Sequence, residues 1–567
     1  MSGFDFFYST AFDFDSIDGI HLLQDHVGTS YPQPWDDYNY TVTFQVHRVV
    51  AGAREPLGRT KILVKNYKNT SDYFLSSTDQ VGSSRRITGL LNPQNVVSLA
   101  SDIDYYRRVG LRLKTEAVEY LRKICDGSYN YDGYKNYSAW GGFDSSLFRS
   151  SMAKAILKKG HQIALGSYEA QDSFSFSLGG LTDCFDALNF NFDNGRTLGP
   201  TNINLLVGRN GVGKSHILRH LVDTLTGVKQ HTESWPFFHK VVVAAYSPFE
   251  SFKTESELSI ALGAEASPPR ETSPENERAS KDEQERRRRL VNEYVYLGFR
   301  DPKGTFSLEW PKESSARAVH RILQYDMENQ WSAVGRFNLL FQTLKRSIEF
   351  DAIELNALGG ESIVLKEKDE ALRHELAGRG DLDYARGIRF LNDGEGVSLS
   401  SGQTIYSYLL PSLVAEVDGE SLLILDEPEL YLHPAMEVGL LDMLKQLLIA
   451  TKSNAIIATH SSILAREVEQ SGISILRKVN GRTEVSRPRV ETFGQTVEVI
   501  MGLAFDDYEI RKPYEDALDS AVKTFSSPEA ALETLGPDVG DEALAYLTAK
   551  VEDDEDGIDI EIERRAE

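Results

Sequence analysis

The sequence has few cysteines, no long apolar run and no excess of basic residues. Its 567 residues include only two cysteines, Cys125 and Cys184, which are too few for a disulfide framework or a cysteine-rich zinc site. No stretch comes near the roughly 20 consecutive apolar residues of a membrane-spanning helix, and residues 1–5 lack the basic start and apolar centre of a signal peptide. These absences predict a cytoplasmic protein in a reducing compartment, without a membrane partner.

The charge balance limits the partners that the protein can bind. Acidic residues outnumber basic ones by 85 to 61, and the formal net charge is -24. Because nucleic acids are bound through clustered lysine and arginine, we expect any nucleic-acid contact to be local. The run Arg286–Arg289 could touch a DNA backbone, but a solvated helix face or flexible arm is the preferred interpretation.

Shifts in composition and pattern divide the chain into four parts. Residues 1–170 predict a separate α+β domain of unknown role. Residues 171–480 are expected to form an α/β nucleotide-binding domain with a mixed sheet and a helical lobe, interrupted by an exposed insertion at about 254–290. Residues 481–551 predict C-terminal helices, and residues 552–567 form an acidic tail.

Local patterns predict the elements of the first part. Alternation predicts strands over 40–46 and 60–65, and helical spacing predicts helices over 105–124 and 146–157. A tyrosine-rich segment between the helical patterns could stack on bases or grip a partner. Packing on its own domain is the preferred interpretation; its aromatic residues are Tyr129, Tyr131, Tyr134, Tyr137 and Trp140.

The second part opens with alternating residues and continues with helical patterns. Residues 174–178 and 188–192 predict a pair of antiparallel strands that lead into the nucleotide-binding domain. Helical spacing over much of 316–348 and over 366–377 predicts the helical lobe.

A glycine-rich turn, Gly208–Ser215, connects a predicted strand to a predicted helix. The apolar run Ile203–Val207 precedes the turn, and apolar positions at helical spacing, His216–Val222, follow it. Glycines in such a turn allow backbone N–H groups to converge on an anion at a helix N-terminus. The pattern predicts a phosphate-binding loop in which Lys214 reaches the β- and γ-phosphates and Ser215 ligates Mg²⁺.

Three further segments follow in order along the chain. Leu399–Gln403 precedes a helical pattern, Ser421–Pro434 begins as an apolar strand that ends in carboxylates, and Asn454–Ser461 is a strand with a histidine just past its end. Alone, each has a common explanation: a helix cap, a strand that runs into a loop, and a structural histidine. Their joint order and spacing behind the phosphate-binding loop are difficult to obtain by chance.

In combination these segments resemble the ABC-type ATPase domain, over about Phe174–Leu476. The phosphate loop, the signature sequence, the strand that ends in Asp-Glu and the switch histidine occur in that family's order. Glu-Pro-Glu-Leu-Tyr-Leu-His-Pro at 427–434 and Ser-Ser-Gly-Gln at 400–403 resemble its soluble SMC, RecF and OLD-like branch. Bacterial proteins with these sequence motifs include DNA-repair ATPases and the ATPase subunits of anti-phage systems of the Septu and OLD-related kind.

The resemblance implies ATP and Mg²⁺ as cofactors and a role for each matching residue. Asp426 would hold Mg²⁺ through water together with Ser215. Glu427 would polarise the attacking water as general base, His460 would sense the γ-phosphate, and Lys214 would share in catalysis. The phosphates would be bound by Asn210, Gly211, Val212, Gly213, Lys214, Ser215 and His216.

The resemblance also implies a second subunit. Ser400 and Gly402 would face the γ-phosphate of ATP bound to the partner, which requires a homodimer or a higher even-numbered oligomer. Two departures stand out. Tyr246–Phe249 occupies the place where many relatives carry a glutamine that contacts Mg²⁺. The insertion between Lys214 and Ser400 is too short for the coiled coils of SMC proteins.

These implications support more than one function. The leading hypothesis is an ATP-hydrolysing switch that controls a separate effector, such as a nuclease, in anti-phage defence. The alternative is an ATP-dependent protein that binds DNA ends or replication forks in DNA repair. A transporter subunit is disfavoured by Glu429, where transporters usually have Thr or Ser, and by the large N-terminal domain. Neither flank carries a nuclease signature, so any cutting would belong to another polypeptide.

Overall fold

The computed structural model describes most of the chain: residues 4–28, 33–34, 39–130, 133, 136–148, 151–169, 173–179, 185–193, 196, 198–229, 236, 238–263, 293–328, 335–504 and 511–551. The chain forms two compact units, Met1–Gly494 and Gln495–Glu567. Several features expected from the sequence lie outside the described residues: most of the insertion, its arginine run, the acidic tail, Cys184, Tyr131 and Tyr134.

The N-terminal lobe of the first unit is built on a seven-stranded sheet with the order β5-β6-β1-β2-β3-β4-β7. Its longest strands, β3 and β4, pair as a hairpin whose two loop residues, Ala51 and Gly52, have φ angles of 51° and 81°. Positive φ at both positions matches the twist of paired strands. The expected strands overlap β3 and β4 but are shorter. The bounds are β1 Phe6–Tyr8, β2 Gly19–Gln24, β3 Thr43–Val50, β4 Ala53–Val64, β5 Gln80–Val81, β6 Ser84–Arg86 and β7 Val96–Ala100.

Helices pack against this sheet through buried aromatic side chains. The helical pattern over 105–124 forms two helices, because Lys114 has a φ of 47° and ends the first of them. Tyr105, Tyr106 and Tyr120 are fully buried between these helices and the sheet. The bounds are α1 Thr70–Leu75, α2 Ile103–Leu113, α3 Ala117–Lys123 and α4 Ser151–Ala164.

The tyrosine-rich segment packs on its own lobe where the structure describes it. Tyr137 is buried in the lobe's core, and its ring meets the ring of Trp140 edge-on at 5.0 Å. Asn130 donates a hydrogen bond to the Tyr137 hydroxyl, and the Lys65 amine lies over the Trp140 ring. These contacts support the packing interpretation rather than base stacking.

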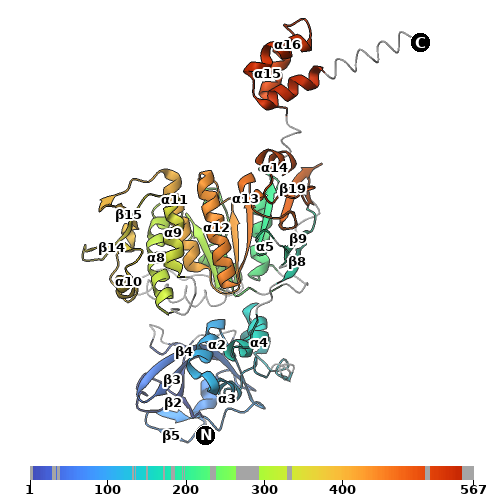
Figure 1. The fold of residues 1–567 in the computed structure, drawn as a ribbon. Coiled ribbons are helices and arrows are strands. Elements are labelled where there is room, and N and C mark those ends of the chain that lie inside the picture. The colour runs from blue at the N-terminus through green and yellow to red at the C-terminus, as the bar shows by residue number, and fades with distance from the viewer. Residues whose placement is uncertain are drawn as a thin grey trace. The chain divides into compact units, whose positions relative to one another are not determined.

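A second seven-stranded sheet, with the order β12-β11-β17-β18-β10-β19-β20, forms the centre of the second lobe of the first unit (Figure 1). All neighbours in it are parallel except the edge strand β20, which is antiparallel to β19. Because β20 belongs to this sheet, the domain continues past residue 480, where we expected it to end. The bounds are β10 Ile203–Gly208, β11 Lys240–Ala245, β12 Glu293–Gly298, β17 Ser421–Asp426, β18 Asn454–Thr459, β19 Ile473–Val479 and β20 Arg482–Ser486.

Parallel strands buried on both faces read as continuous apolar runs, and every residue of β10, β11 and β17 is buried. The antiparallel pair expected ahead of them is confirmed, with Phe174 opposite Phe192 and Leu178 opposite Leu188. The bounds of this pair and of the helices around the sheet are β8 Phe174–Leu178, β9 Leu188–Phe192, α5 Lys214–Leu225, α6 Glu255–Gly263, α12 Pro434–Thr451 and α13 Ser462–Arg466.

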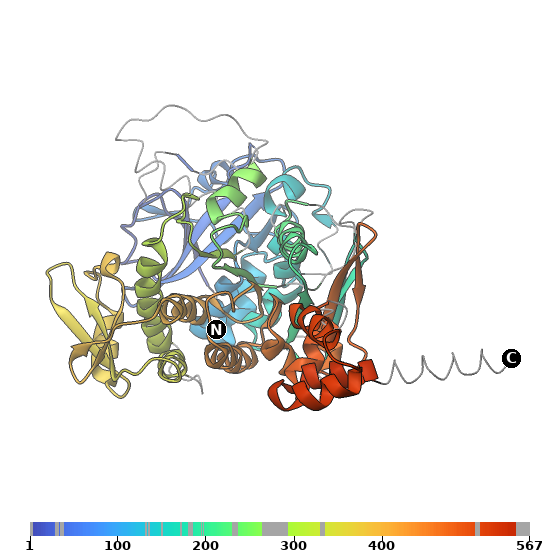
Figure 2. The same cartoon turned by 90° about the horizontal axis from the view of Figure 1, so that it is seen from above.

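The helical lobe lies to one side of this sheet and carries a small sheet of its own. Helices α8, α9 and α11 pack together (Figure 1), and the strands β14-β13-β15-β16 project beyond them (Figure 2). The sequence predicted the helices but not these antiparallel strands. The bounds are α8 Trp310–Glu328, α9 Arg336–Lys345, α10 Glu370–Ala377, α11 Ser401–Glu416, β13 Ala352–Asn356, β14 Ser362–Lys366, β15 Arg389–Asn392 and β16 Glu395–Gly396.

The second unit is helical, as expected for the C-terminal region. Leu518, Ala531 and Leu547 form its buried contacts. Its helices are α14 Val497–Ala504, α15 Pro513–Val522, α16 Pro528–Leu535 and a last helix over 541–551. Within the parts of the chain that the structure describes, no helix combines the length and apolar character needed to cross a membrane.

Candidate nucleotide-binding site

Three loops meet at the carboxyl edge of the central sheet. Strand β18 lies between β10 and β17 and pairs in parallel with both, with Thr459 opposite Val207 and Ala458 opposite Asp426. Parallel neighbours end at the same edge of a sheet, and ligands of such sheets bind outside the carboxyl ends of the strands. The register therefore brings the phosphate-binding loop, the end of β17 and His460 together.

The phosphate-binding loop has the backbone geometry that its glycines permit. Gly211 and Gly213 have φ angles of 81° and 104°, in the left-handed region that favours glycine. A Cβ at Gly208 would lie 2.5 Å from the carbonyl oxygen of Leu476, so this position accepts no side chain. The amine of Lys214 turns back over the loop and donates to the carbonyl of Gly208 at 3.0 Å.

Lys214, His460 and Glu427 form a triad of side chains in close contact in the centre of the site. The Lys214 Nζ lies 2.5 Å from His460 Nε2 and 3.5 Å from Glu427 Oε1. His460 Nε2 lies 2.9 Å from the same carboxylate oxygen. Burial lowers the pKa of Lys214, and Glu427 opposes that effect. The hydrogen bond from His460 lowers the pKa of Glu427 in spite of its partial burial, which keeps this carboxylate ionised.

Ser215 and Asp426 supply oxygen ligands of the kind that Mg²⁺ prefers. The Ser215 hydroxyl donates to Asp426 Oδ1 at 3.1 Å. Burial raises the pKa of Asp426 to about 6, and a nearby cation would lower it again. Across the described ranges, no three histidine, cysteine or carboxylate side chains gather into a set of metal ligands. The pair fits a magnesium ion that is held by few protein ligands and completed by phosphate and water oxygens.

The remaining residues expected in the loop occupy its outer side. Asn210, Gly211 and His216 are exposed, and Val212 is buried, with its carbonyl accepting a hydrogen bond from Thr483. The sequence analysis did not single out Phe185, whose ring stacks on that of His216 at 5.5 Å. A Cβ at Gly213 would lie 2.8 Å from the Phe185 ring. Phe185 lies between the two alternating segments, 174–178 and 188–192, and only their presence on either side indicated structure here.

Ser400 and Gly402 lie at the start of α11. Ser400 is exposed and caps the helix: its hydroxyl accepts from the N–H of Gln403, and the Gln403 side chain accepts from the Ser400 N–H. The position of Gly402 requires glycine, because a Cβ there would lie 2.5 Å from the carbonyl oxygen of Tyr431. In the described part of the chain, the hydrogen bonds of Ser400 are local ones, to Gln403 and Thr404. Among the described residues, Ser400 makes no hydrogen bond to the phosphate loop of its own chain.

The segment after β11 has no glutamine to serve as a lid. Tyr246 is buried, and Phe249 is 92% exposed. The nearest carboxylate, Glu250, accepts hydrogen bonds from Tyr296 at 2.6 Å and from Arg300 at 2.9 Å.

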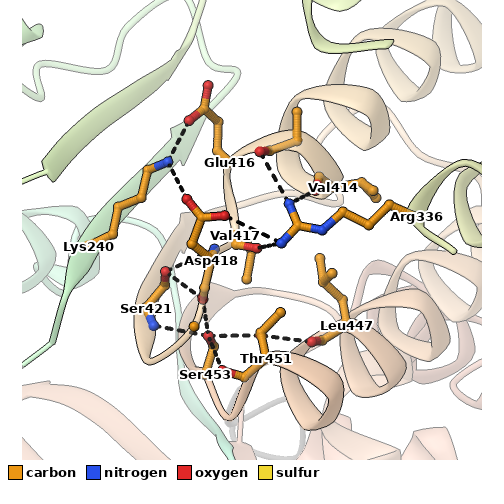
Figure 3. Close-up of polar contacts among 12 residues, drawn as sticks. Lys240, Arg336, Val414, Glu416, Val417, Asp418, Ser421, Leu447, Thr451 and Ser453 are labelled. Carbon is orange, nitrogen blue, oxygen red and sulfur yellow. Dashed lines mark hydrogen bonds and ion pairs between the residues drawn. The ribbon is translucent and has the colours of Figure 1, made fainter. Parts of the chain in front are cut away.

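A cluster of buried charges lies at the opposite, amino-terminal edge of the same sheet (Figure 3). We call Lys240, Arg336, Glu416 and Asp418 the base network. Lys240 contacts Glu416 at 2.8 Å and Asp418 at 3.2 Å, while Arg336 contacts Asp418 at 3.4 Å. Burial alone would raise the pKa of both carboxyl groups, but the cations lower it. The network joins the end of α11 to the start of β11 and of α9.

The segment that carries the base network also contacts the N-terminal lobe of the same unit. The Glu420 carboxylate accepts hydrogen bonds from Lys159 at 3.1 Å and from the Tyr168 hydroxyl at 2.7 Å. His239 lies 3.7 Å from the same carboxylate, and burial lowers its pKa to about 4, so it is neutral at pH 7. Arg107 of α2 reaches the His239 ring at 3.4 Å.

The chain is similar, over its central part, to an ATPase domain of the AAA type. A sequence profile for a family described as "AAA domain, putative AbiEii toxin, Type IV TA system" matches residues 203–466. That range begins with the first residue of β10 and ends with the last residue of α13, and it contains Lys214, Ser215, Asp426, Glu427 and His460.

One relative matches nearly the whole chain. The protein ea59 of Escherichia phage lambda is 24% identical over 556 residues, which cover 92% of this chain and 94% of that protein. An ATP-binding cassette of an ABC transporter in its ADP conformation is 12% identical, covers 58% of this chain and 90% of its own, and superposes with a TM-score of 0.24. An SMC head bound to the winged-helix domain of ScpA is 14% identical, covers 53% and 92%, and has a TM-score of 0.27.

Proposed function

We propose that this protein is an ATP-hydrolysing switch that dimerises around ATP and controls a separate effector protein. The observation that carries the proposal is the meeting of Lys214, Glu427 and His460, beside the Ser215 and Asp426 pair, at one edge of the sheet. Phosphoryl transfer is catalysed mainly by positioning and electrostatic stabilisation. These residues supply both: cations for the phosphates, oxygen ligands for Mg²⁺ and an ionised carboxylate for water.

Each side chain has a role that follows from its place. ATP with Mg²⁺ supplies the phosphoryl group and part of the charge compensation. Lys214 and the N–H groups of the glycine turn hold the phosphates. Glu427 orients the attacking water and accepts its proton, which requires the ionised form that the His460 hydrogen bond favours. His460, next to both Glu427 and Lys214, is placed to contact the γ-phosphate.

The exposed start of α11 supports the dimer. Ser400 is exposed and its hydrogen bonds stay within its own turn, so its helix N-terminus is available to an anion from outside the chain. Gly402 lies against the backbone of Tyr431, in the loop that follows Glu427. The Ser400 turn therefore packs beside the loop that follows Glu427 in the same chain, and both lie where a partner subunit would bind. A second copy, related by a two-fold axis, would close each site with its own Ser400 turn.

The far end of α11 supports transmission of the ATP-bound state. α11 has 16 residues and is about 24 Å long at a rise of 1.5 Å per residue. It ends at Glu416 in the base network, and Glu420 follows with its contacts to Lys159 and Tyr168 of the N-terminal lobe. Movement of the Ser400 turn toward a partner would thus be passed along one continuous helix, which contains Pro411, to the N-terminal lobe.

We further propose that the switch acts in defence against phage. The description of the matching family, with its toxin and type IV toxin–antitoxin system, supports this role. The near full-length relative is encoded by a phage, so such a chain could also serve one phage against a competitor. The effector, such as a nuclease, would be a separate polypeptide, because neither flank of the ATPase domain carries a nuclease signature.

ATP turnover by the purified protein tests the enzymatic part. We expect magnesium-dependent release of phosphate from wild type, loss of at least about 100-fold on Glu427→Gln, and weak ATP binding by Lys214→Ala. Absence of turnover in wild type would reject the proposed activity. Retention of DNA by Glu427→Gln in the presence of ATP, without any effect on phage growth, would favour the DNA-end or fork-binding alternative.

The defence role has its own test in cells. Cells that express the protein with its neighbouring genes would be challenged with phage. Protection by wild type but not by Glu427→Gln is the expected result, and equal protection by both would reject a role for hydrolysis in defence.

A further inference from the structure

Glu429 lies two residues after Glu427 and directs its carboxylate at the backbone beside His460. One oxygen, Oε1, accepts hydrogen bonds from the His460 N–H at 2.6 Å and from the Thr459 hydroxyl at 2.7 Å. The Thr459 hydroxyl in turn accepts from the N–H of Ser461 at 2.9 Å. A single carboxylate oxygen therefore holds the whole turn that follows β18.

The carboxylate of Glu429 is largely buried, unlike that of a typical surface glutamate. Its second oxygen, Oε2, is buried and has no hydrogen-bond partner among the described residues. Burial raises the pKa of Glu429. A buried polar group with an unmet bond is destabilising and persists where it has another use. Here the carboxylate serves to hold the backbone at His460, because its two donors are the His460 N–H and the hydroxyl of the preceding residue, Thr459.

Glu427 and Glu429 together fix His460 from two sides. Glu427 accepts from the imidazole Nε2 at 2.9 Å, while Glu429 accepts from the backbone N–H at 2.6 Å. The N–H of Glu427 also donates to the carbonyl of Ala458, which ties this loop to the end of β18. Loss of the Glu429 acceptor would remove one of the two contacts by which these carboxylates hold His460.

We propose that Glu429 is a positioning residue that sets the place of His460 relative to Glu427 and to the γ-phosphate. This inference rests on the proposed ATPase function. Glu429 acts through His460 and does not touch the reacting atoms. Displacement of a catalytic group by about 1 Å can slow a reaction about 100-fold, so the support of His460 should be visible in the rate.

Three substitutions separate this role from a general effect on folding. Glu429→Met keeps the length of the side chain but removes the acceptor, Glu429→Gln keeps the acceptor, and Thr459→Val removes one donor while the His460 N–H remains. We expect Glu429→Met to lower kcat about 30- to 100-fold with an unchanged KM for ATP, and Glu429→Gln and Thr459→Val to stay within about five-fold of wild type. Binding of a fluorescent ATP analogue by each variant shows that the site is folded; if Glu429→Met does not fold, Glu429→Ala takes its place.

The decisive comparison uses His460→Ala as background. If Glu429 acts through His460, Glu429→Met should slow the His460→Ala enzyme by less than two-fold, since the group that it positions is gone. An equal loss in both backgrounds, a wild-type kcat for Glu429→Met, or a Glu429→Gln enzyme as slow as Glu429→Met would overturn the inference. Failure of the proposed function is distinguishable, because in that case wild type itself releases no phosphate and Glu427→Gln changes nothing.

Discussion

Replacement of Lys240 by methionine removes one cation from the base network with little change in side-chain length. Lys240 is 8% exposed, and its partner Glu416 is 4% exposed. Removal of one partner from a buried ion pair destabilises a protein by about 3–5 kcal/mol when nothing replaces it. Here Glu416 keeps Arg321 and Asp418 keeps Arg336. We therefore expect the free energy of unfolding to fall by a smaller amount, about 2–3 kcal/mol.

Calorimetry measures this change, and the chain offers a matched control. The loss corresponds to a fall in Tm of roughly 2–3 °C for the unit Met1–Gly494, at an unfolding entropy of about 2.1 cal/mol/K per residue. Lys345 pairs with Glu367 at 4.0 Å on the surface, where the two side chains are 41% and 27% exposed. Such a pair contributes less than about 1 kcal/mol, so Lys345→Met should hardly change Tm. Equal melting temperatures for the Lys240→Met and Lys345→Met variants would refute the reasoning.

The effect of Lys240→Met should also depend on pH in a direction that the structure fixes. The pKa values of Glu416 and Asp418 are lowered in the folded protein. Stability from lowered carboxyl groups is complete above their unfolded pKa values of about 4, and it is lost as the pH falls through the folded values. The difference in stability between wild type and Lys240→Met should therefore narrow on acidification below about pH 4.

Three more predictions concern other parts of the first unit. Lys214→Ala removes the buried cation that would meet the phosphates, and equilibrium binding of ATP should weaken about 10- to 100-fold; unchanged affinity would remove Lys214 from the site. Burial raises the pKa of Asp126 to about 7, so this carboxyl group destabilises the N-terminal lobe as the pH rises from about 4 to 7; Asp126→Asn should slow hydrogen exchange in β7 relative to wild type at pH 8 but not at about pH 4, and an equal ratio at both would contradict this. Glu420→Ala removes the acceptor of Lys159 and Tyr168, and hydrogen exchange in α4 should rise about five-fold or more; an unaltered rate would show that these bonds do not hold α4.

The parts of the site that follow single strands could be predicted from the sequence. Gly208–Ser215 and the carboxylates after β17 are contiguous motifs, because each loop carries its own ligands to the end of one strand. The pairing of β18 with both β10 and β17 then brings them together, and the order of the motifs along the chain already indicated that meeting. The strands β8 and β9 could also be predicted from the sequence, because their residues alternate between apolar and polar.

Features that depend on distant partners could not be predicted in this way. The base network joins Lys240 to Glu416 across 176 positions, and nothing local to either residue specifies that pairing. Glu429 was noted only as a mark of the soluble branch, because its role depends on where the turn after β18 lies. The small sheet over 352–396 has short strands interrupted by polar and glycine-rich turns, and its β14 exposes every second residue. Such edges have a weaker periodic signal than the fully buried strands of the core.

The association of Glu427→Gln in the presence of ATP tests the central claim most directly. This substitution keeps the shape of the side chain but removes the acceptor for the proton of water, so a bound ATP would remain uncleaved. The measurement is the molar mass of the purified variant by light scattering, with magnesium and with or without ATP. We expect a monomer without ATP and a dimer that retains two ATP molecules with it. A monomer under both conditions, or ATP turnover at the wild-type rate, would show that ATP does not hold two subunits together in this way.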